Sequence, residues 1–322
     1  LYNNTLIAEL VPEDTVNIKQ LGYINTMTAG DTVTFLNNSL SKYSNILIKD
    51  ETLTTNDTVS VNDNQKILLE NAKIHNTSVD NKKYIFSING VSNVEIKGLG
   101  SELYFDKPSQ PQQACIKIGG TSSNISIYGV DLKSAGGDGI TASDTTNVTI
   151  ENCFIYNSRR NGISLIGNID KFIIRNCKIT NTSGTNPQYA IDLETWEDES
   201  YNNNVLIENC YFSGNTGGAI DIMPYNTNIT IRNNEFNNNL LNSVITQAKA
   251  PNGYPKNVII DNNSFTTKGI YIRGTQYAEY TITNNKFNTA GITTETESDL
   301  SNFYNVAPKD GSLIIKNNIF KN

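Results

Sequence analysis

The sequence predicts an all-β fold, a parallel β-helix of about ten coils with a short helix that caps its N-terminal end. Three observations predict it. A short phrase recurs about ten times, each full copy follows a run of alternating polar and apolar residues, and no repeat holds an amphipathic run long enough for a helix. The copies lie roughly 22 to 33 residues apart, which is a solenoid spacing. Each repeat should therefore form one coil of three short strands.

The recurring phrase consists of an alternating run, then Asn, then Cys or Asn, then any residue, then Ile or Phe. Asn at the end of a strand tolerates the left-handed backbone of a tight corner. We expect Asn152, Asn176 and Asn209 to stack at one corner and to hydrogen-bond up the stack. The apolar residue that ends the phrase should form an internal stack, whose members are Ile155, Ile179, Phe212, Phe236, Phe265, Phe287 and Phe320.

The cysteines occupy the same slot of the phrase in three successive copies, Cys153, Cys177 and Cys210, while later copies place Asn there. A cysteine that takes the place of Asn in a repeated slot is most simply interpreted as a buried free thiol. Cys115 lies outside the phrase. The pattern does not indicate a disulfide framework, so it does not specify an oxidising compartment.

The first fifty residues differ from the rest. Residues 31–43 place Val33, Leu36, Leu40 and Tyr43 on one helical face, with Asp31 as the expected N-cap. We therefore interpret residues 1–50 as a first strand with a capping helix, and residues 51–322 as one continuous β-helix. A full repeat ends at Phe320 without a cap. We expect the chain to be part of a longer protein whose native form is a homotrimer.

Composition excludes several classes of function. The chain is 37% hydrophobic and 18% charged, which is too apolar for a disordered protein, and its apolar runs are too short to cross a membrane. A formal net charge of -7 argues against a nucleic-acid partner. His75 is the only histidine and CxxC is absent, which argues against a zinc site and a Ser-His-Asp triad. Carboxylates, Arg, Lys, Tyr or a hard cation must supply any chemistry.

The repeat also gives a register for the strand that follows the corner. Ile140, Ile163, Ile191, Ile220 and Val244 should point inward, so the next residue of each strand points outward. Asp192 and Asp221 then become neighbours on adjacent coils, and Glu194 lies on the same face about 7 Å along the strand. Repulsion among these three carboxylates should raise one pKa. We predict Asp192, Glu194 and Asp221 as catalytic residues in a shallow groove on the outer face; the bland alternative is that they are ordinary solvated side chains.

Other residue types near these carboxylates suit a carbohydrate. Aromatic faces pack against sugar rings, and guanidinium groups bind uronates or phosphates. The expected substrate-binding residues are Asp138, Arg159, Arg160, Tyr189, Trp196, Tyr225 and Gln247. No dedicated metal site or cofactor is predicted, although the acidic cluster could hold Ca²⁺.

Residues 14–22, the helical stretch and residues 44–53 are similar to the start of phage tail-spike β-helices. Over essentially its whole length the chain resembles the pectate-lyase-like (pectin-lyase-like), single-stranded right-handed β-helix superfamily, and most of all the tail-spike or appendage proteins of phages that infect Gram-positive bacteria. The polygalacturonase, pectate lyase and uronate epimerase motifs of that superfamily are absent here. The match is therefore to a fold pattern, and it implies a virion or otherwise secreted location.

The resemblance implies a protein, usually a trimer, that binds and cleaves bacterial surface polysaccharide or teichoic acid. The acidic face favours a glycoside hydrolase. Three alternatives stay open at this point: a polysaccharide lyase, a phosphodiesterase that cleaves teichoic acid with a carboxylate-held cation, and a receptor-binding or structural β-helix without catalysis.

Overall fold

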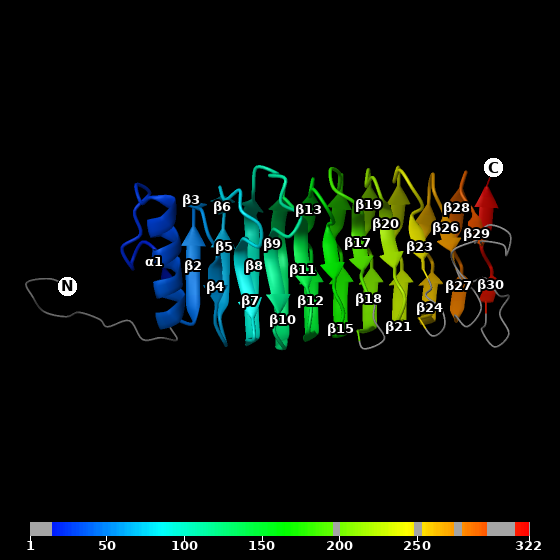
Figure 1. Ribbon diagram of the computed structural model, residues 1–322, viewed down its shortest axis with the longest axis horizontal. Helices are drawn as coiled ribbons and strands as arrows, with labels where there is room; N and C mark the ends of the chain where they lie inside the picture. Colours follow the sequence, from blue (N-terminus) through cyan, green and yellow to red (C-terminus); the bar gives the residue numbers. More distant parts are fainter. Residues whose placement is uncertain (1–14, 196–199, 248–252, 274–278, 295–312, 322) are drawn as a thin grey trace, which may run out of the picture.

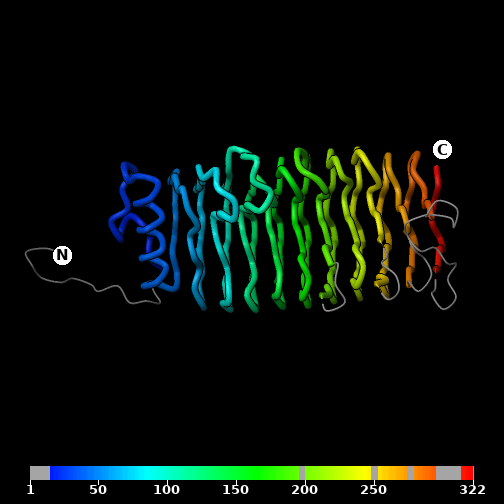
Figure 2. The backbone as a smooth tube through the Cα atoms, in the orientation of Figure 1, coloured from blue at the N-terminus to red at the C-terminus, as the bar shows by residue number. Residues whose placement is uncertain are grey.

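The computed structural model describes residues 15–195, 200–247, 253–273, 279–294 and 313–321. The described chain forms an elongated parallel β-helix whose coils follow one another along the long axis, with the single helix at the N-terminal end (Figures 1 and 2). The paired strands of the described chain run parallel, and each pairing connects one coil to the next. The predicted fold class is confirmed.

Three columns of strands make up the solenoid. Two columns meet at a corner and form one continuous sheet of 21 strands, and the third column is a separate sheet of ten strands. The first column contains β1 (Thr15–Asn17), β2 (Asn45–Lys49), β5 (Lys66–Glu70), β8 (Ser92–Tyr104), β10 (Ser122–Lys133), β12 (Thr145–Glu151), β15 (Ile169–Arg175), β18 (Asn202–Glu208), β21 (Asn226–Arg232), β24 (Lys256–Asp261), β27 (Tyr280–Thr283) and β30 (Leu313–Lys316).

The long strands β8 and β10 continue around the corner into the second column. Its other members are β3 (Thr52–Thr55), β6 (Lys73–Asn76), β13 (Phe154–Tyr156), β16 (Lys178–Thr180), β19 (Tyr211–Ser213), β22 (Glu235–Asn237), β25 (Ser264–Phe265), β28 (Lys286–Asn288) and β31 (Ile319–Lys321). The ten-stranded sheet contains β4 (Val59–Val61), β7 (Tyr84–Asn89), β9 (Ala114–Gly119), β11 (Asp138–Ala142), β14 (Ile163–Leu165), β17 (Tyr189–Leu193), β20 (Gly218–Ile222), β23 (Val244–Thr246), β26 (Ile270–Ile272) and β29 (Ile292–Thr294).

The interior holds the stack that the repeat predicts. Ring centroids of consecutive stacked phenylalanines lie 4.7 to 5.1 Å apart, from Phe212 through Phe236 and Phe265 to Phe287. These four side chains are fully buried. Because the strand register places equivalent residues directly above one another, one aromatic per coil produces a continuous column of ring contacts.

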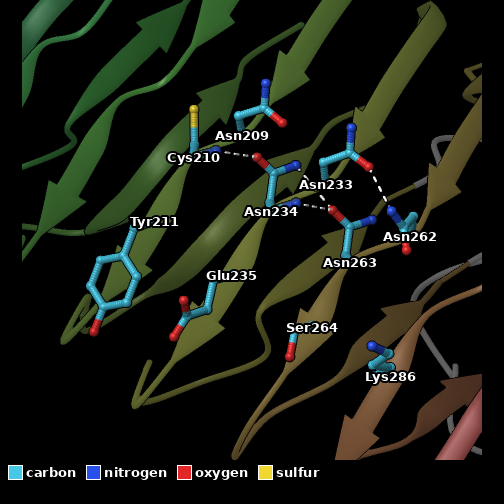
Figure 3. A pocket seen from close by; sticks show the side chains of 10 residues that line it. All are labelled: Asn209, Cys210, Tyr211, Asn233, Asn234, Glu235, Asn262, Asn263, Ser264 and Lys286. Carbon is cyan, nitrogen blue, oxygen red and sulfur yellow. Dashed lines mark hydrogen bonds between the residues drawn. The ribbon is translucent and has the colours of Figure 1, made fainter.

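The corner after the first column combines backbone strain with a ladder of side-chain hydrogen bonds. The first Asn of the phrase has a left-handed backbone in each full copy, with φ of 54° at Asn152, Asn176 and Asn209. The buried ladder itself runs through the second slot: Asn234 Nδ2 donates to Asn263 Oδ1 (3.0 Å; Figure 3), and Asn263 Nδ2 donates to Asn285 Oδ1 (3.1 Å). The first Asn residues were expected to stack and to hydrogen-bond up the stack. They follow equivalent positions in successive coils, and Asn262 Nδ2 donates to Asn233 Oδ1 (2.8 Å), whereas Asn176 Nδ2 donates to Glu151 Oε1 (3.4 Å).

The four cysteines are free and buried, as predicted. Cys153, Cys177 and Cys210 fill the ladder slot in three successive coils, and the backbone N–H of Cys210 donates to Asn234 Oδ1 (2.8 Å) where the asparagine ladder begins. A thiol therefore substitutes for the amide in a slot whose size and burial stay constant.

The capping helix α1 spans Ala29–Lys42 and begins three residues earlier than expected. Thr28 is the N-cap: its hydroxyl accepts the Asp31 backbone N–H (3.2 Å) and donates to the Asp31 carboxylate (2.7 Å). Asp31 lies in the first turn and returns the cap contact, so the two residues together cap the helix end. Leu36 and Leu40 are buried against the first coils.

Candidate active groove

The outer face of the ten-stranded sheet carries the predicted carboxylates in the predicted order. Asp192 on β17 and Asp221 on β20 are direct Cα partners, and Ser164 on β14 precedes them in the same outward column. Their chain neighbours Ile191 and Ile220 are fully buried in the interior. The alternation of inward and outward residues therefore follows the repeat.

These two aspartates are buried, which corrects the expectation of a solvated outer face. Asp192 and Asp221 are each only 3% exposed. Every other residue of β17 and β20 is buried as well, so both faces of the sheet are covered here. Asp192 Oδ2 accepts from Asn161 Nδ2 (3.1 Å), and Asp221 Oδ2 accepts from Gln247 Nε2 (2.7 Å). The Oδ1 atom of each aspartate is buried without a hydrogen-bond partner among the described residues.

Burial has the expected electrostatic consequence. Desolvation, followed by the neighbouring charge of Asp221, raises the pKa of Asp192 well above its ordinary value. Desolvation also raises the pKa of Asp221 to about 7, against the lowering effects of Gln247 and Arg273. Two adjacent carboxyl groups that cannot both ionise cheaply will retain a proton near neutral pH.

A second pair of carboxyl groups is joined by one arginine. Arg160 Nη1 donates to Asp138 Oδ2 (3.1 Å), and Arg160 Nη2 donates to Glu194 Oε2 (2.7 Å). Asp138 opens β11 and is 3% exposed, and its Oδ1 accepts the backbone N–H of Asn161 (3.0 Å). Burial raises the pKa of Asp138 to about 6, even though Arg160 opposes the shift. Asp138, predicted only to assist binding, is thus a titrating group.

These residues open into a groove of about 480 Å³. Its lining comes from neighbouring coils of the ten-stranded sheet and from the loops that enter it, and consists of Lys82, Tyr84, Pro111, Gln112, Gln113, Lys117, Asp138, Thr141, Ser143, Arg160, Ile166 and Glu194. Asp192 and Asp221 lie beside this groove and do not line it. Small outward residues, Thr141 and Ser143, leave the space that larger side chains would fill.

A glycine explains how one wall of the groove approaches the sheet. The loop between β8 and β9 brings the carbonyl oxygens of Pro111 and Gln113 so close to Gly137 that a Cβ there would lie 2.5 and 2.4 Å from them. Gly137 immediately precedes Asp138. The glycine run therefore lets the loop close over the start of β11, which buries the Asp138 carboxyl group.

The structure separates some predicted residues from the groove. Arg159 Nε donates to Thr185 Oγ1 (3.1 Å), away from the carboxylates. Tyr189 is buried beside the aspartate pair, and burial followed by the charges of Asp221 and Asp192 raises its pKa. Gln247 contacts Asp221, and Tyr225 does not line the groove. Trp196 lies outside the described residues.

Sequence reasoning missed the upstream half of the groove, which Lys82, Tyr84 and Lys117 supply. Lys117 is the Cα partner of Thr141, one coil further along the same outward column. Continuing the register upstream would have found Lys117. The repeat phrase is faint in those coils, because the long strands β8 and β10 run around the corner without it.

A second hollow, of about 540 Å³, lies at the asparagine corner (Figure 3). It is lined by Asn209, Cys210, Tyr211, Asn233, Asn234, Glu235, Asn262, Asn263, Ser264 and Lys286. The amides there mainly bond one another. The hollow follows from the shape of the repeated corner, so the smaller groove is the better candidate site.

Within the described ranges, no group of three or more His, Cys, Asp or Glu side chains is arranged to hold a metal ion. No described helix has the length and apolarity needed to cross a membrane.

Comparison with known proteins gives a family. The chain matches the family model described as "Right handed beta helix region" over residues 24–199 and 114–287, and it therefore belongs to that family. No curated protein matches significantly by sequence.

Solved structures share the fold at low sequence identity. A surface adhesin of Streptococcus pneumoniae, PfbA, superposes with a TM-score of 0.68 at 13% identity, covering 95% of this chain and 91% of the adhesin. The tailspike gp49 of Acinetobacter baumannii bacteriophage Fri1, a capsular polysaccharide depolymerase, gives 0.58 at 14% identity, covering 95% and 62%. The catalytic domain of a GH87 alpha-1,3-glucanase, solved with tetrasaccharides, gives 0.52 at 14% identity, covering 95% and 70%.

Proposed function

We propose that this right-handed β-helix protein binds and cleaves bacterial cell-surface polysaccharide or teichoic acid, and that it does so as a glycoside hydrolase in the 480 Å³ groove. The observation that carries the proposal is the pair of unlike carboxyl groups that line this groove. Asp138 is buried and has a pKa of about 6, whereas the Glu194 side chain is 25% exposed and pairs with Arg160 at 2.7 Å.

Glycoside hydrolysis needs one carboxylic acid that protonates the leaving oxygen and one carboxylate that acts as base or nucleophile. The two roles can be assigned when the surroundings give the two carboxyl groups different pKa values, because the group with the higher pKa keeps its proton. Asp138 is the acid in this proposal, because it carries the raised pKa. Glu194 is the carboxylate, and the Arg160 guanidinium between the two keeps them from sharing a proton.

Asp192 and Asp221 have a supporting role in the proposal. They are buried next to the strand end that presents Glu194, and they hold a proton near neutral pH. Coulombic repulsion from Asp192 and Asp221 therefore stays small around Glu194. Asp192 and Asp221 do not themselves line the groove.

The comparisons support the proposal at the level of the fold. A polysaccharide depolymerase and a glucanase are among the solved proteins that share it. The proposed setting is the outside of a cell or a phage tail, with the chain in a homotrimer. The adhesin with the same fold supports the competing proposal of binding without cleavage.

The test is incubation of the protein with purified capsular polysaccharides and wall teichoic acids, followed by analysis of product ends. New reducing ends are expected, and Asp138→Asn should lower their rate of appearance by about 10² to 10⁴. Unsaturated, ultraviolet-absorbing ends would establish a lyase instead, and new phosphomonoester ends a phosphodiesterase. Retained binding with no new ends would establish an adhesin and refute the hydrolase.

A further inference from the structure

We propose that the upstream half of the groove recognises an anionic group of the glycan, a carboxylate or a phosphate, through Lys82 and Lys117. This inference rests on the proposed function in one respect, that the groove receives a saccharide. The saccharide is anionic in this proposal, and Lys82 and Lys117 select it.

The groove has a basic end and an acidic end. Lys117 on β9 belongs to the same outward column as Asp192, three coils upstream, since Lys117 pairs with Thr141, Thr141 with Ser164, and Ser164 with Asp192. Glu194 of the groove follows β17 in the same coil as Asp192, so at a strand spacing of about 4.8 Å the coil of Lys117 lies about 14 Å from the coil of Glu194. A bound chain can therefore touch both ends at once, over more than one sugar unit.

Tyr84 marks the floor at the basic end. It opens β7 and aligns with Ala114, which aligns with Asp138, so two coil spacings separate Tyr84 from Asp138. The intervening Ala114 is small and buried, which leaves room above it. The Lys117 Nζ lies 5.4 Å from the centroid of the Tyr84 ring. A half-buried aromatic ring beside a cation offers a sugar both an apolar surface and a countercharge.

The carboxylates at the acidic end have an ion-pair partner, whereas the lysines at the basic end have none among the described residues. Asp138 and Glu194 already have Arg160 as their cation. Lys82 and Lys117 form no ion pair with any residue in the described ranges, whereas the adjacent Lys83 pairs with Asp57 at 2.8 Å. Both unpaired lysines line the groove of a protein whose formal net charge is -7. Unpaired cations that converge in a groove favour an anionic ligand group.

Arginine was the expected anion-binding residue type, and its placement strengthens this assignment. Arg159 donates to Thr185, and Arg160 is occupied by two carboxylates. Arg159 does not line the groove, and Arg160 already pairs with two carboxylates. The two lysines are the groove-lining cations that remain.

The matched control comes from the opposite face of the coil. Lys66 and Lys97 line a separate hollow of about 370 Å³ over β1, β2, β5 and β8. Lys97 Nζ lies 5.7 Å from the Tyr128 ring centroid, which reproduces the Lys117–Tyr84 geometry. The double variant Lys66→Gln/Lys97→Gln therefore removes the same charge from the same kind of contact outside the groove.

The experiment is affinity electrophoresis of the folded protein through gels that contain polygalacturonate, poly(glycerol phosphate) or neutral dextran. We expect retardation by an anionic polymer and none by dextran, with Lys82→Gln/Lys117→Gln raising the dissociation constant about tenfold and the control double variant leaving it unchanged. Retardation by polygalacturonate identifies a carboxylate as the group, and retardation by poly(glycerol phosphate) identifies a phosphate.

Retardation by dextran alone, by no polymer, or equally in the Lys82→Gln/Lys117→Gln variant would overturn the inference. Circular dichroism on the same samples confirms that each variant is folded. The inference and the proposed function fail separately: anionic binding without cleavage removes only the hydrolase, and cleavage that is indifferent to the two lysines removes only the anionic subsite.

Discussion

The corner column and the outer column of the ten-stranded sheet run along the same solenoid, yet their residues follow different rules. From Phe236 to Phe287 the corner repeats one choice from coil to coil, with stacked Phe inside and Asn in the ladder slot. From Ser87 to Ile245 the outer column changes its residue at every coil but one, reading Ser87, Lys117, Thr141, Ser164, Asp192, Asp221 and Ile245.

The difference separates what the fold requires from what it tolerates. A repeated residue satisfies its neighbours above and below, as each ladder amide does. In the outer column the register stays regular while the buried Oδ1 atoms of Asp192 and Asp221 have no hydrogen-bond partner in the described part of the chain, which costs stability. Residues that the fold does not require, and that cost it stability, are the ones we associate with function.

The largest expected effect is on the repeated interior stack. Phe236→Ala removes a fully buried ring that stacks on Phe212 and Phe265, and should lower the free energy of unfolding by about 3 to 5 kcal/mol. Denaturant unfolding measures it. Phe154→Ala is the control, because Phe154 lies on the outer side of β13 and is only half-buried. Equal losses for the two variants would contradict the stack as a source of stability.

In the outer column, replacing Asp221 should raise the free energy of unfolding, whereas replacing Phe236 lowers it. The folded pKa of Asp221, about 7, lies above the ordinary value of 3.8, so the folded state binds the additional proton and its stability falls as pH rises from about 4 to 7. Asp221→Asn removes this penalty. We expect the variant to gain on the order of 2 to 4 kcal/mol over the parent at pH 8 and little at pH 4. A pH-independent loss of stability would show that the charge is needed by the fold.

The ladder should show an intermediate effect. Asn263→Ala removes the bridge between Asn234 and Asn285 and leaves buried polar atoms without partners, which should cost about 1 to 3 kcal/mol. Asn263→Cys places in this coil the residue that three other coils use, so it should cost less than the alanine variant. Thermal unfolding of both variants decides this; a cysteine variant that is the less stable of the two would rule out the shared slot.

The smallest effect concerns the N-terminal cap. Thr28→Ala removes the hydroxyl that accepts the Asp31 N–H and should cost about 1 kcal/mol. Asp31→Asn keeps a hydrogen-bonding side chain in the first turn and is expected to cost less. If Asp31→Asn proves the more damaging change in denaturant unfolding, then Asp31 and not Thr28 determines where the helix begins.

The sequence predicted whatever repeats. Period-2 alternation and the Asn phrase were sufficient for the three strand columns, the Phe stack, the free cysteines and the pairing of Asp192 with Asp221. It did not predict burial of that pair, nor that of Asp138, which depends on a loop that folds back over the outer face and carries no repeat. The close approach at Gly137 is one example, since a glycine beside Asp138 is equally typical of an open turn.

The groove shows the same limit. Glu194 and Arg160 were both expected near the site, but only the structure joins them and adds Asp138 to the same guanidinium. Lys117 was within reach of the register, whereas Lys82 comes from a turn before β7 that no repeat constrains. Residues on loops between strands can be placed only once their neighbours in space are known.

If the carboxylates of the groove perform catalysis, two glutamates in similar ion pairs should respond differently to the loss of their charge. Glu194 pairs with Arg160 and Glu151 pairs with Arg175, each at 2.7 Å and with similar side-chain exposure, but Glu151 lies on the 21-stranded sheet away from the groove. The measurement is the rate of polymer cleavage at pH 7 by folded Glu194→Gln and Glu151→Gln. We predict a loss of about 10² to 10⁴ for Glu194→Gln and the parent rate for Glu151→Gln; equal rates for the two variants would contradict the account.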